Sequence, residues 1–132
     1  MEKKVILITG ASGALGKQIA AYLESQGHAL ILHYFQHPIR SENPNVMTIA
    51  CDLRIPSEME EMINQVILRF GRIDVLINNA GISKSNVAWK TTAEAWRQTM
   101  QINLDAPFFL SQAVIPSMRA HAFGRIINIT SV

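Results

Sequence analysis

Glycines recur at short spacing near the start of the chain, in the segment Thr9-Gly10-Ala11-Ser12-Gly13-Ala14-Leu15-Gly16. An aliphatic run precedes this segment and a helical pattern follows it, so it joins a strand to a helix. Glycines there allow a tight turn and a close approach to phosphate, which the free N–H groups and dipole of the helix attract. The segment therefore predicts a site for the pyrophosphate of a dinucleotide, formed by Gly10, Ser12, Gly13, Leu15 and Gly16.

The end of the second predicted strand bears on which dinucleotide would bind. Folds of this kind place an acidic residue there, about 20 residues after the turn, against the ribose hydroxyls. This chain has His33, Tyr34 and Phe35 at that place, and none of them is a carboxylate. The missing carboxylate removes repulsion against a 2′-phosphate, which His33, His37 or Arg40 would face. We therefore expect NADP(H) to be favoured over NAD(H), with Tyr34 among the cofactor-binding residues.

Short apolar runs alternate with segments of helical period, a pattern typical of a parallel sheet with helices on both faces. The predicted strands cover residues 5–9, 29–34, 46–50, 74–78 and 125–129. The predicted helices cover residues 15–25, 57–70 and 92–118, with Ser57 and Glu60 as a capping box, Gly71 as a stop and Pro107 as a kink. A loop over residues 35–45 replaces one helix. The expected fold is one α/β domain over residues 1–132, a three-layer, Rossmann-type, doubly wound sheet of strand order 3-2-1-4-5.

Composition excludes several other classes of protein. Charged residues make up 17 % of the chain, the net charge is +2, and like charges do not cluster, so we expect no nucleic-acid partner. Cys51 is the one cysteine, and no Cys/His spacing predicts a metal site. Without a long apolar run there is no predicted membrane span, and we expect a cytoplasmic protein.

Further motifs follow the later predicted strands. They are Cys51-Asp52-Leu53, Asn78-Asn79-Ala80-Gly81, Asn103 within the last helix, and the strand Gly124-Arg125-Ile126-Ile127-Asn128-Ile129-Thr130-Ser131. In order and spacing the whole set resembles the N-terminal portion of the short-chain dehydrogenase/reductase family. The resemblance implies that Asp52 and Leu53 bind the adenine, that Asn79, Ala80 and Gly81 wall the adenosine, that Asn103 holds a water of the proton relay, and that Ser131 polarises the substrate carbonyl.

Within that family, the chain looks most like 3-oxoacyl-carrier-protein and acetoacetyl-CoA reductases. The resemblance implies hydride transfer between a nicotinamide cofactor and a small carbonyl or alcohol substrate, such as an acyl thioester. It also implies a homodimer or homotetramer in which the helix over residues 92–118 makes contacts. Trp89 and Trp96 are then expected to pack or to lie in an interface rather than to stack on the cofactor.

The sequence departs from the family in two places. Ala14 stands where the family has its middle glycine, and the glycine at Gly13 fits the extended branch, which includes nucleotide-sugar epimerases; an epimerase fragment therefore stays open. The family's Tyr-three residues-Lys pair is also missing, since neither Tyr22 nor Tyr34 has Lys four positions later. Losing a general acid costs about 10²- to 10⁴-fold in rate. We therefore expect the chain alone to lack activity, as a truncated enzyme with an uncovered strand over residues 125–129 or as a dinucleotide-binding protein without catalysis.

Overall fold

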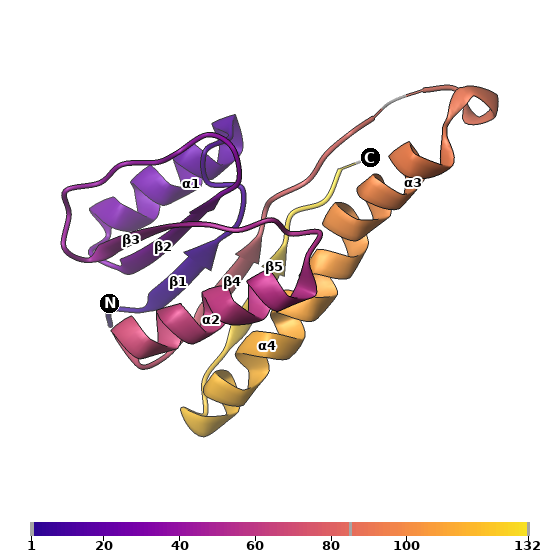
Figure 1. The fold of residues 1–132 in the computed structure, drawn as a ribbon. Coiled ribbons are helices and arrows are strands. Elements are labelled where there is room, and N and C mark those ends of the chain that lie inside the picture. The colour runs from indigo at the N-terminus through magenta and orange to yellow at the C-terminus, as the bar shows by residue number, and fades with distance from the viewer. Residues whose placement is uncertain (1, 85, 132) are drawn as a thin grey trace.

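The computed structural model describes residues 2–84 and 86–131, and its centre is one sheet of five parallel strands (Figure 1). The strands are β1 (Val5–Ile8), β2 (Ala29–Tyr34), β3 (Val46–Ala50), β4 (Val75–Asn78) and β5 (Arg125–Asn128). They lie in the order β3-β2-β1-β4-β5, which confirms the predicted order. Strands β2 and β3 are added on one side of β1, and β4 and β5 on its other side. The direction of the connections therefore reverses between β1 and β4, and a crevice opens at the carboxyl ends of these two strands.

Helices connect the strands and cover both faces of the sheet. The α-helices are α1 (Ala14–Ser25), α2 (Pro56–Phe70), α3 (Ala93–Met100) and α4 (Ala106–Ala120). A short 3₁₀ turn, η1 (Ala88–Lys90), precedes α3, and a π-helical segment, η2 (Gln101–Asp105), joins α3 to α4. The connection from β2 to β3 is the expected loop.

The start of α2 differs from the prediction. The capping box of Ser57 and Glu60 is wrong, because the N-cap is Ile55 and Pro56 is the first helical residue. Proline favours that position because its missing N–H would have no helical partner there, and its fixed φ suits a helix. The helix therefore begins before Ser57. Its predicted end is confirmed, since Gly71 caps α2 in the left-handed region at φ 77°.

The predicted helix over residues 92–118 is a run of three helical pieces. Thr92 is the N-cap of the first piece, α3, and its side chain accepts the Ala95 N–H at 3.1 Å. In η2 the backbone widens, and the Ala106 N–H bonds to the carbonyl of Gln101, five residues back. Pro107 then lies in the first turn of α4, where a missing N–H is tolerated. The proline is thus accommodated by a π-helical segment directly before it.

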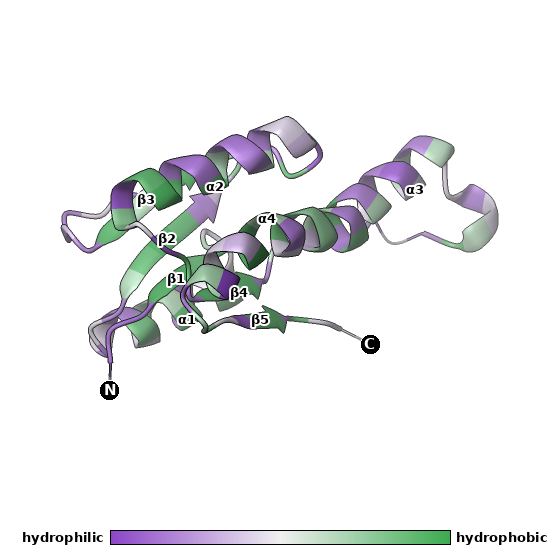
Figure 2. Ribbon diagram, turned by 90° about the horizontal axis from the view of Figure 1, so that it is seen from below, coloured by the Kyte–Doolittle hydropathy of each residue, from purple (hydrophilic) through white to green (hydrophobic). Residues whose placement is uncertain are grey.

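Two core clusters lie on opposite faces of the sheet. Figure 2 shows α1 on one face and α2 with α4 on the other, with hydrophobic ribbon between them. Alternate residues of β1 serve the two clusters: Leu7 packs toward α2 and α4, and Ile8 packs toward α1. Both side chains are fully buried. This arrangement confirms the predicted three layers, and it fixes the loops that surround the crevice.

One edge of the sheet is uncovered in the part of the chain that the structure describes. All four residues of β5 are exposed, and β5 pairs with β4 alone. Ile126 and Ile127 are 38 % and 45 % exposed. The sequence-based expectation of an exposed apolar strand is therefore confirmed.

Candidate functional site

The glycine turn after β1 is shaped by close backbone contacts. Gly10 has φ +62°, a conformation that L side chains rarely adopt. A Cβ on Gly16 would lie 2.4 Å from the Gly10 carbonyl oxygen and 2.8 Å from the Ala11 Cα. No side chain caps α1 at Gly13. The first turn of α1 therefore presents backbone N–H groups at the crevice, as a phosphate site requires.

Asn79, directly after β4, ties that strand to the glycine turn. Its side-chain amide donates to the carbonyls of Thr9 at 3.1 Å and Gly10 at 3.2 Å. The Thr9 hydroxyl oxygen in turn accepts the N–H groups of Asn79 at 3.0 Å and Ala80 at 2.9 Å. These bonds hold Ala80 against Gly10, where any Cβ on Gly10 would meet the Ala80 Cα at 2.8 Å. The Asn-Asn-Ala-Gly motif thus positions one wall of the crevice.

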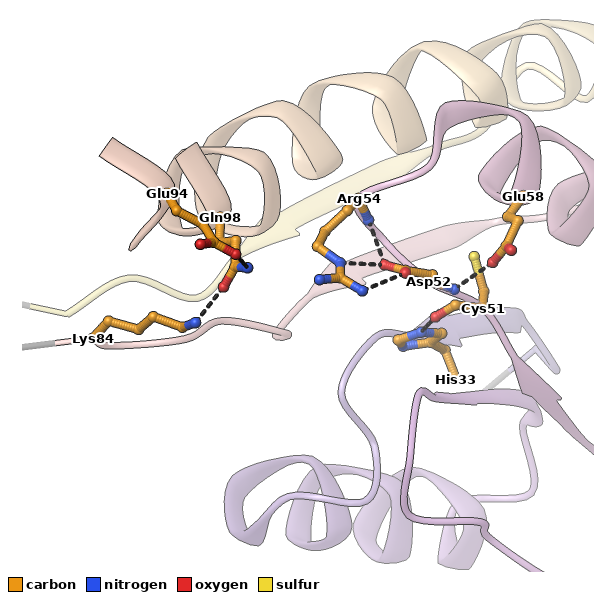
Figure 3. A network of polar contacts seen from close by, with 8 residues as sticks. All are labelled: His33, Cys51, Asp52, Arg54, Glu58, Lys84, Glu94 and Gln98. Carbon is orange, nitrogen blue, oxygen red and sulfur yellow. Dashed lines mark hydrogen bonds and ion pairs between the residues drawn. The ribbon is translucent and has the colours of Figure 1, made fainter. Parts of the chain in front are cut away.

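The turn after β3 carries an ion pair. The Asp52 carboxylate accepts Arg54 Nε at 2.9 Å and Nη2 at 2.7 Å, together with the Arg54 backbone N–H at 3.0 Å (Figure 3). These bonds from Arg54 hold the pKa of Asp52 below its usual value. The Arg54 guanidinium also lies 5.5 Å from the centre of the Phe35 ring. Glu58 of α2 accepts the Asp52 N–H at 2.7 Å, so this turn is fixed from both sides.

His33, near the end of β2, is buried with 2 % of its surface exposed. Its Nδ1 accepts the Gly10 N–H at 3.0 Å, and its Nε2 lies 2.9 Å from the Cys51 carbonyl oxygen. Burial lowers the pKa of this imidazole from its ordinary 6.5, although the bond to Cys51 opposes that shift. Both ring nitrogens are engaged by the backbone, so the expectation that a charged His33 faces a phosphate is wrong.

These segments line one cleft of about 590 Å³. The predicted cofactor-binding residues that line it are Gly10, Ser12, Gly13, Leu15, Gly16, Asp52, Leu53, Asn79, Ala80 and Gly81. Tyr34 is absent from this lining, and its place is taken by Phe35, Gln36 and His37 of the following loop. Side chains two residues apart in a strand point to the same face of the sheet. Tyr34 is therefore on the same face as Leu30 and Leu32, which belong to the core cluster packed against α1. Its backbone carbonyl accepts the Cys51 N–H at 3.1 Å.

Several lining residues were missed from the sequence. Arg54 lines the cleft beside Asp52, and Lys84, Gln98 and Ile102 line its far end. The Lys84 ammonium donates to the side-chain carbonyl of Gln98 (Figure 3). A signal for Arg54 was present, because an arginine two residues after an aspartate in a turn can bond back to it. The Lys84 pair depends on how α3 packs, and no local pattern reveals that.

The two predicted catalytic residues lie beyond the cleft lining. The Asn103 side chain accepts the Ile82 N–H at 2.9 Å and donates to the Ile82 carbonyl at 2.8 Å. It therefore fixes the segment after Gly81 to η2. Ser131 is exposed and follows β5 at the carboxyl edge of the sheet.

The cleft suits a dinucleotide on structural grounds. Its volume is that of a cofactor pocket, one wall is the glycine-rich first turn of a helix, and Asp52 lines the same cleft from the turn after β3. A side chain at Gly16 would fill the turn, so the space there is held open for close approach. Among the described residues no group of three or more His, Cys, Asp or Glu could hold a metal ion.

Comparison with known proteins shows which family has this fold and these motifs. The family model of the short chain dehydrogenases matches residues 4–132. The chain belongs to the short-chain dehydrogenase family. This is a family of NAD(P)-dependent oxidoreductases, and the relatives confirm the resemblance drawn from the motifs.

Three similar proteins illustrate the match. A 3-oxoacyl-(acyl-carrier-protein) reductase of Staphylococcus epidermidis is 33 % identical, covering 98 % of this chain and 57 % of the relative. A short-chain dehydrogenase structure from Streptomyces avermitilis aligns with TM-score 0.91 and 28 % identity, over 98 % of this chain and 50 % of that one. A metagenomic short-chain oxidoreductase in complex with NADP aligns with TM-score 0.88 and 30 % identity, over 98 % and 62 %. The chain thus spans between half and about three-fifths of the length of these three proteins.

No helix within residues 2–84 and 86–131 combines the length and the apolar character needed to cross a bilayer.

Proposed function

We propose that this chain is the cofactor-binding part of an NADP(H)-dependent carbonyl reductase acting on a 3-oxoacyl-type substrate. The observation that carries the proposal is one cleft lined by three motifs from distant parts of the sequence: the glycine turn, Asp52 with Leu53, and the segment from Asn79 to Gly81. The relatives named 3-oxoacyl-(acyl-carrier-protein) reductase support the substrate class.

In this proposal each motif has a separate task. The glycine turn holds the pyrophosphate, Asp52 and Leu53 hold the adenine, and Asn79 walls the adenosine. The bound nicotinamide supplies the hydride. Ser131 donates a hydrogen bond to the substrate carbonyl oxygen, where negative charge develops as hydride arrives. Asn103 holds the backbone after Gly81 and, as the family resemblance implies, a water of the proton relay.

The 132 residues contain no Tyr-three residues-Lys pair to protonate the alkoxide, so we propose that they bind cofactor without turnover. A test mixes the purified chain with NADPH and acetoacetyl-CoA, following NADPH fluorescence for binding and NADPH absorbance for oxidation. We expect bound NADPH that is oxidised no faster than in buffer. Oxidation at an enzymatic rate would contradict the proposed inactivity. A purely binding role is the second candidate, and it would remain if a longer chain containing these residues also failed to oxidise NADPH.

A basic pocket supports NADP(H) over NAD(H). It has a volume of about 400 Å³ between α1 and the loop after β2. Lys17 and Arg40 contribute its positive side chains, and His37 also lines it. Ser12 and His37 line both this pocket and the main cleft, so the two adjoin. Glu24 is the carboxylate in its lining, and Glu24 accepts the Asn43 side-chain amide at 2.8 Å. A 2′-phosphate placed here would meet Lys17 and Arg40.

Removing this charge should change the preference between cofactors. We expect the double variant K17Q/R40Q to bind NADPH about 5- to 30-fold more weakly, because hydrogen bonds to charged groups contribute about 1.5–3 kcal/mol and these groups are partly solvated. NADH affinity should stay within twofold of wild type. K84Q is the matched control, since Lys84 lines the far end of the cleft and should affect both cofactors alike. An equal loss for NADPH and NADH in K17Q/R40Q would contradict this assignment.

An apolar stripe supports the proposed homo-oligomer. Along α3, η2 and α4 the side chains of Trp96, Leu104, Phe108 and Ile115 are 61 %, 57 %, 62 % and 42 % exposed. Trp89, in η1, is 83 % exposed. Contiguous exposed apolar side chains on one surface mark interfaces more often than free surface. The tryptophans thus fit an interface better than a place beside the cofactor, since neither lines the cleft.

The oligomer predicts a measurable change in mass. We expect the wild-type chain to elute as a dimer or tetramer, and L104E/F108E to elute as a monomer, because buried like charges would oppose association. The measurement is light scattering after size exclusion. L68E is the control, since Leu68 of α2 is 88 % exposed and lies outside the stripe. A wild-type monomer at high concentration would refute the proposed contact.

We propose the cytoplasm as the compartment. Cys51 is the only cysteine of the chain and is buried. Burial raises the pKa of its thiol to about 12, with Glu58 and Asp52 adding to the shift, so the thiol stays protonated and unreactive. A reducing compartment suits a chain that forms no internal disulfide.

A further inference from the structure

His33 connects three strand ends at the point where the cofactor cleft begins. Its ring accepts the Gly10 N–H at 3.0 Å, and its backbone carbonyl accepts the next N–H, that of Ala11, at 2.9 Å. On its other side the ring reaches the Cys51 carbonyl at 2.9 Å, one residue before Asp52 (Figure 3). The imidazole therefore lies between the turn proposed for pyrophosphate and the turn proposed for adenine.

The two backbone partners determine the protonation state of the ring. A backbone N–H can only donate, so Nδ1 must carry a lone pair to accept from Gly10. A carbonyl oxygen can only accept, so Nε2 must carry the proton to donate to Cys51. Only the neutral Nε2–H tautomer satisfies both contacts. A protonated ring would point an N–H at the Gly10 N–H, and that contact would become repulsive.

We propose that neutral His33 is a positioning residue for the dinucleotide, and that protonation of its ring releases the glycine turn and weakens cofactor binding at acid pH. The inference rests on the proposed function. Gly10 has little room to adapt by other means, because its φ is +62° and even an added Cβ would meet the Ala80 Cα at 2.8 Å. Loss of the ring acceptor would leave the Gly10 N–H unpaired in a partly buried site.

The charged groups beside this ring pair with one another. Asp52, which follows Cys51 in the turn after β3, pairs with Arg54 at 2.7 Å, and Glu58 of α2 accepts the Asp52 N–H at 2.7 Å. The Cys51 thiol is neutral, and His37 of the loop after β2 lines the same cleft. Burial of His33 is the largest influence on its pKa and lowers it.

The expected pH dependence follows from that direction. His33 stays neutral in the folded chain down to a pH below 6.5, its ordinary pKa, and binding is therefore intact near neutral pH. As the pH falls through the lowered pKa, the ring takes up a proton and the Gly10 bond is lost. An unpaired buried donor costs about 1–3 kcal/mol. Because the Gly10 N–H is only partly buried, the affinity should fall about 5- to 30-fold once His33 is protonated.

The test measures the Kd of NADP⁺, which is stable in acid, from pH 8 down to the lowest pH at which wild type, H33N and H33M stay folded. Asparagine places its side-chain oxygen near the position of Nδ1 and can accept the Gly10 N–H without titrating. Methionine has similar volume but cannot accept it strongly. Comparing variants with one ligand cancels the titration of the 2′-phosphate, whose second pKa is about 6. Circular dichroism at each pH reports whether each chain is folded.

At pH 8 we expect H33N to bind within about threefold of wild type and H33M to bind at least about fivefold more weakly. At the lowest pH at which both chains stay folded, the wild-type Kd should have risen at least fivefold more than that of H33N. Parallel pH profiles for wild type and H33N would overturn the inference, even if H33M fails to fold. Absence of binding by folded wild-type chain at pH 8 would instead refute the proposed function, and the inference with it.

Discussion

Replacing Gly16 by alanine should lower the affinity for NADP(H) at least about tenfold and destabilise the fold by about 1–3 kcal/mol. The added Cβ would lie 2.4 Å from the Gly10 carbonyl oxygen and 2.8 Å from the Ala11 Cα. Both neighbours are backbone atoms, so the turn itself must move. Displacing it misdirects the N–H groups at the start of α1 that the pyrophosphate requires.

The matched control for G16A is G13A. A Cβ on Gly13 would meet the Gly10 carbonyl oxygen at 3.4 Å, which is ordinary contact, and Gly13 has an extended backbone with φ −76°. We expect G13A to bind and melt close to wild type. Fluorescence titration with NADPH and urea unfolding of both variants check the pair. Equal behaviour of G16A and G13A would mean that the turn is not a tight cradle.

Replacing Asp74 by alanine should lower the free energy of unfolding by about 2–4 kcal/mol. Asp74 precedes β4, and only 2 % of its side chain is exposed. Its carboxylate accepts the Val5 N–H at 2.8 Å and Arg72 Nε at 2.8 Å. The variant would leave a buried N–H unpaired at the start of β1. The expected loss of stability is smaller than for a fully buried pair, because 34 % of the Arg72 side chain is exposed and can be hydrated.

R72Q separates the two bonds of Asp74. It removes the ion pair but keeps the acceptor for Val5. Because the buried Asp74 carboxylate then loses its cation, we expect a loss of about 1–2 kcal/mol, smaller than that of D74A. Urea unfolding of D74A and R72Q makes the comparison. If R72Q were as unstable as D74A, the ion pair rather than the Val5 bond would hold the sheet together here.

The fold was accessible from sequence because its signals are local and agree with one another. The strands of this sheet are short aliphatic runs, and the helices carry periodic apolar stripes such as Met59, Met62, Ile63 and Val66 of α2, all buried. Where two residues could each mark the start of a helix, the one with the stronger preference determines where the helix begins. Pro56 begins α2 ahead of the capping box at Ser57, and the π-helical segment before Pro107 adjusts a helix that the periodicity alone predicts as continuous.

The site was partly accessible for the same reason. Backbone-based features such as the turn at Gly10 and Gly16 follow from residue type. The role of His33 does not, because it depends on the distance between the ends of three strands, which no sequence pattern contains. The prediction for Tyr34 failed for a related reason, because Phe35, Gln36 and His37 of the next loop line the cleft in its place. The sequence predicted Asp52 as a site residue, but the bond that Arg54 donates to it became visible only in the structure.

The central claim is that the glycine turn and the cleft beside it bind a dinucleotide. The most direct measurement is calorimetric titration of the purified 132-residue chain at pH 8 with NADPH and, separately, with NADH, using G16A as the reference. We predict saturable one-to-one binding of NADPH, weaker binding of NADH, and strongly reduced heat for G16A. A folded wild-type chain that binds neither cofactor, or that binds NADPH no better than G16A does, would contradict the claim.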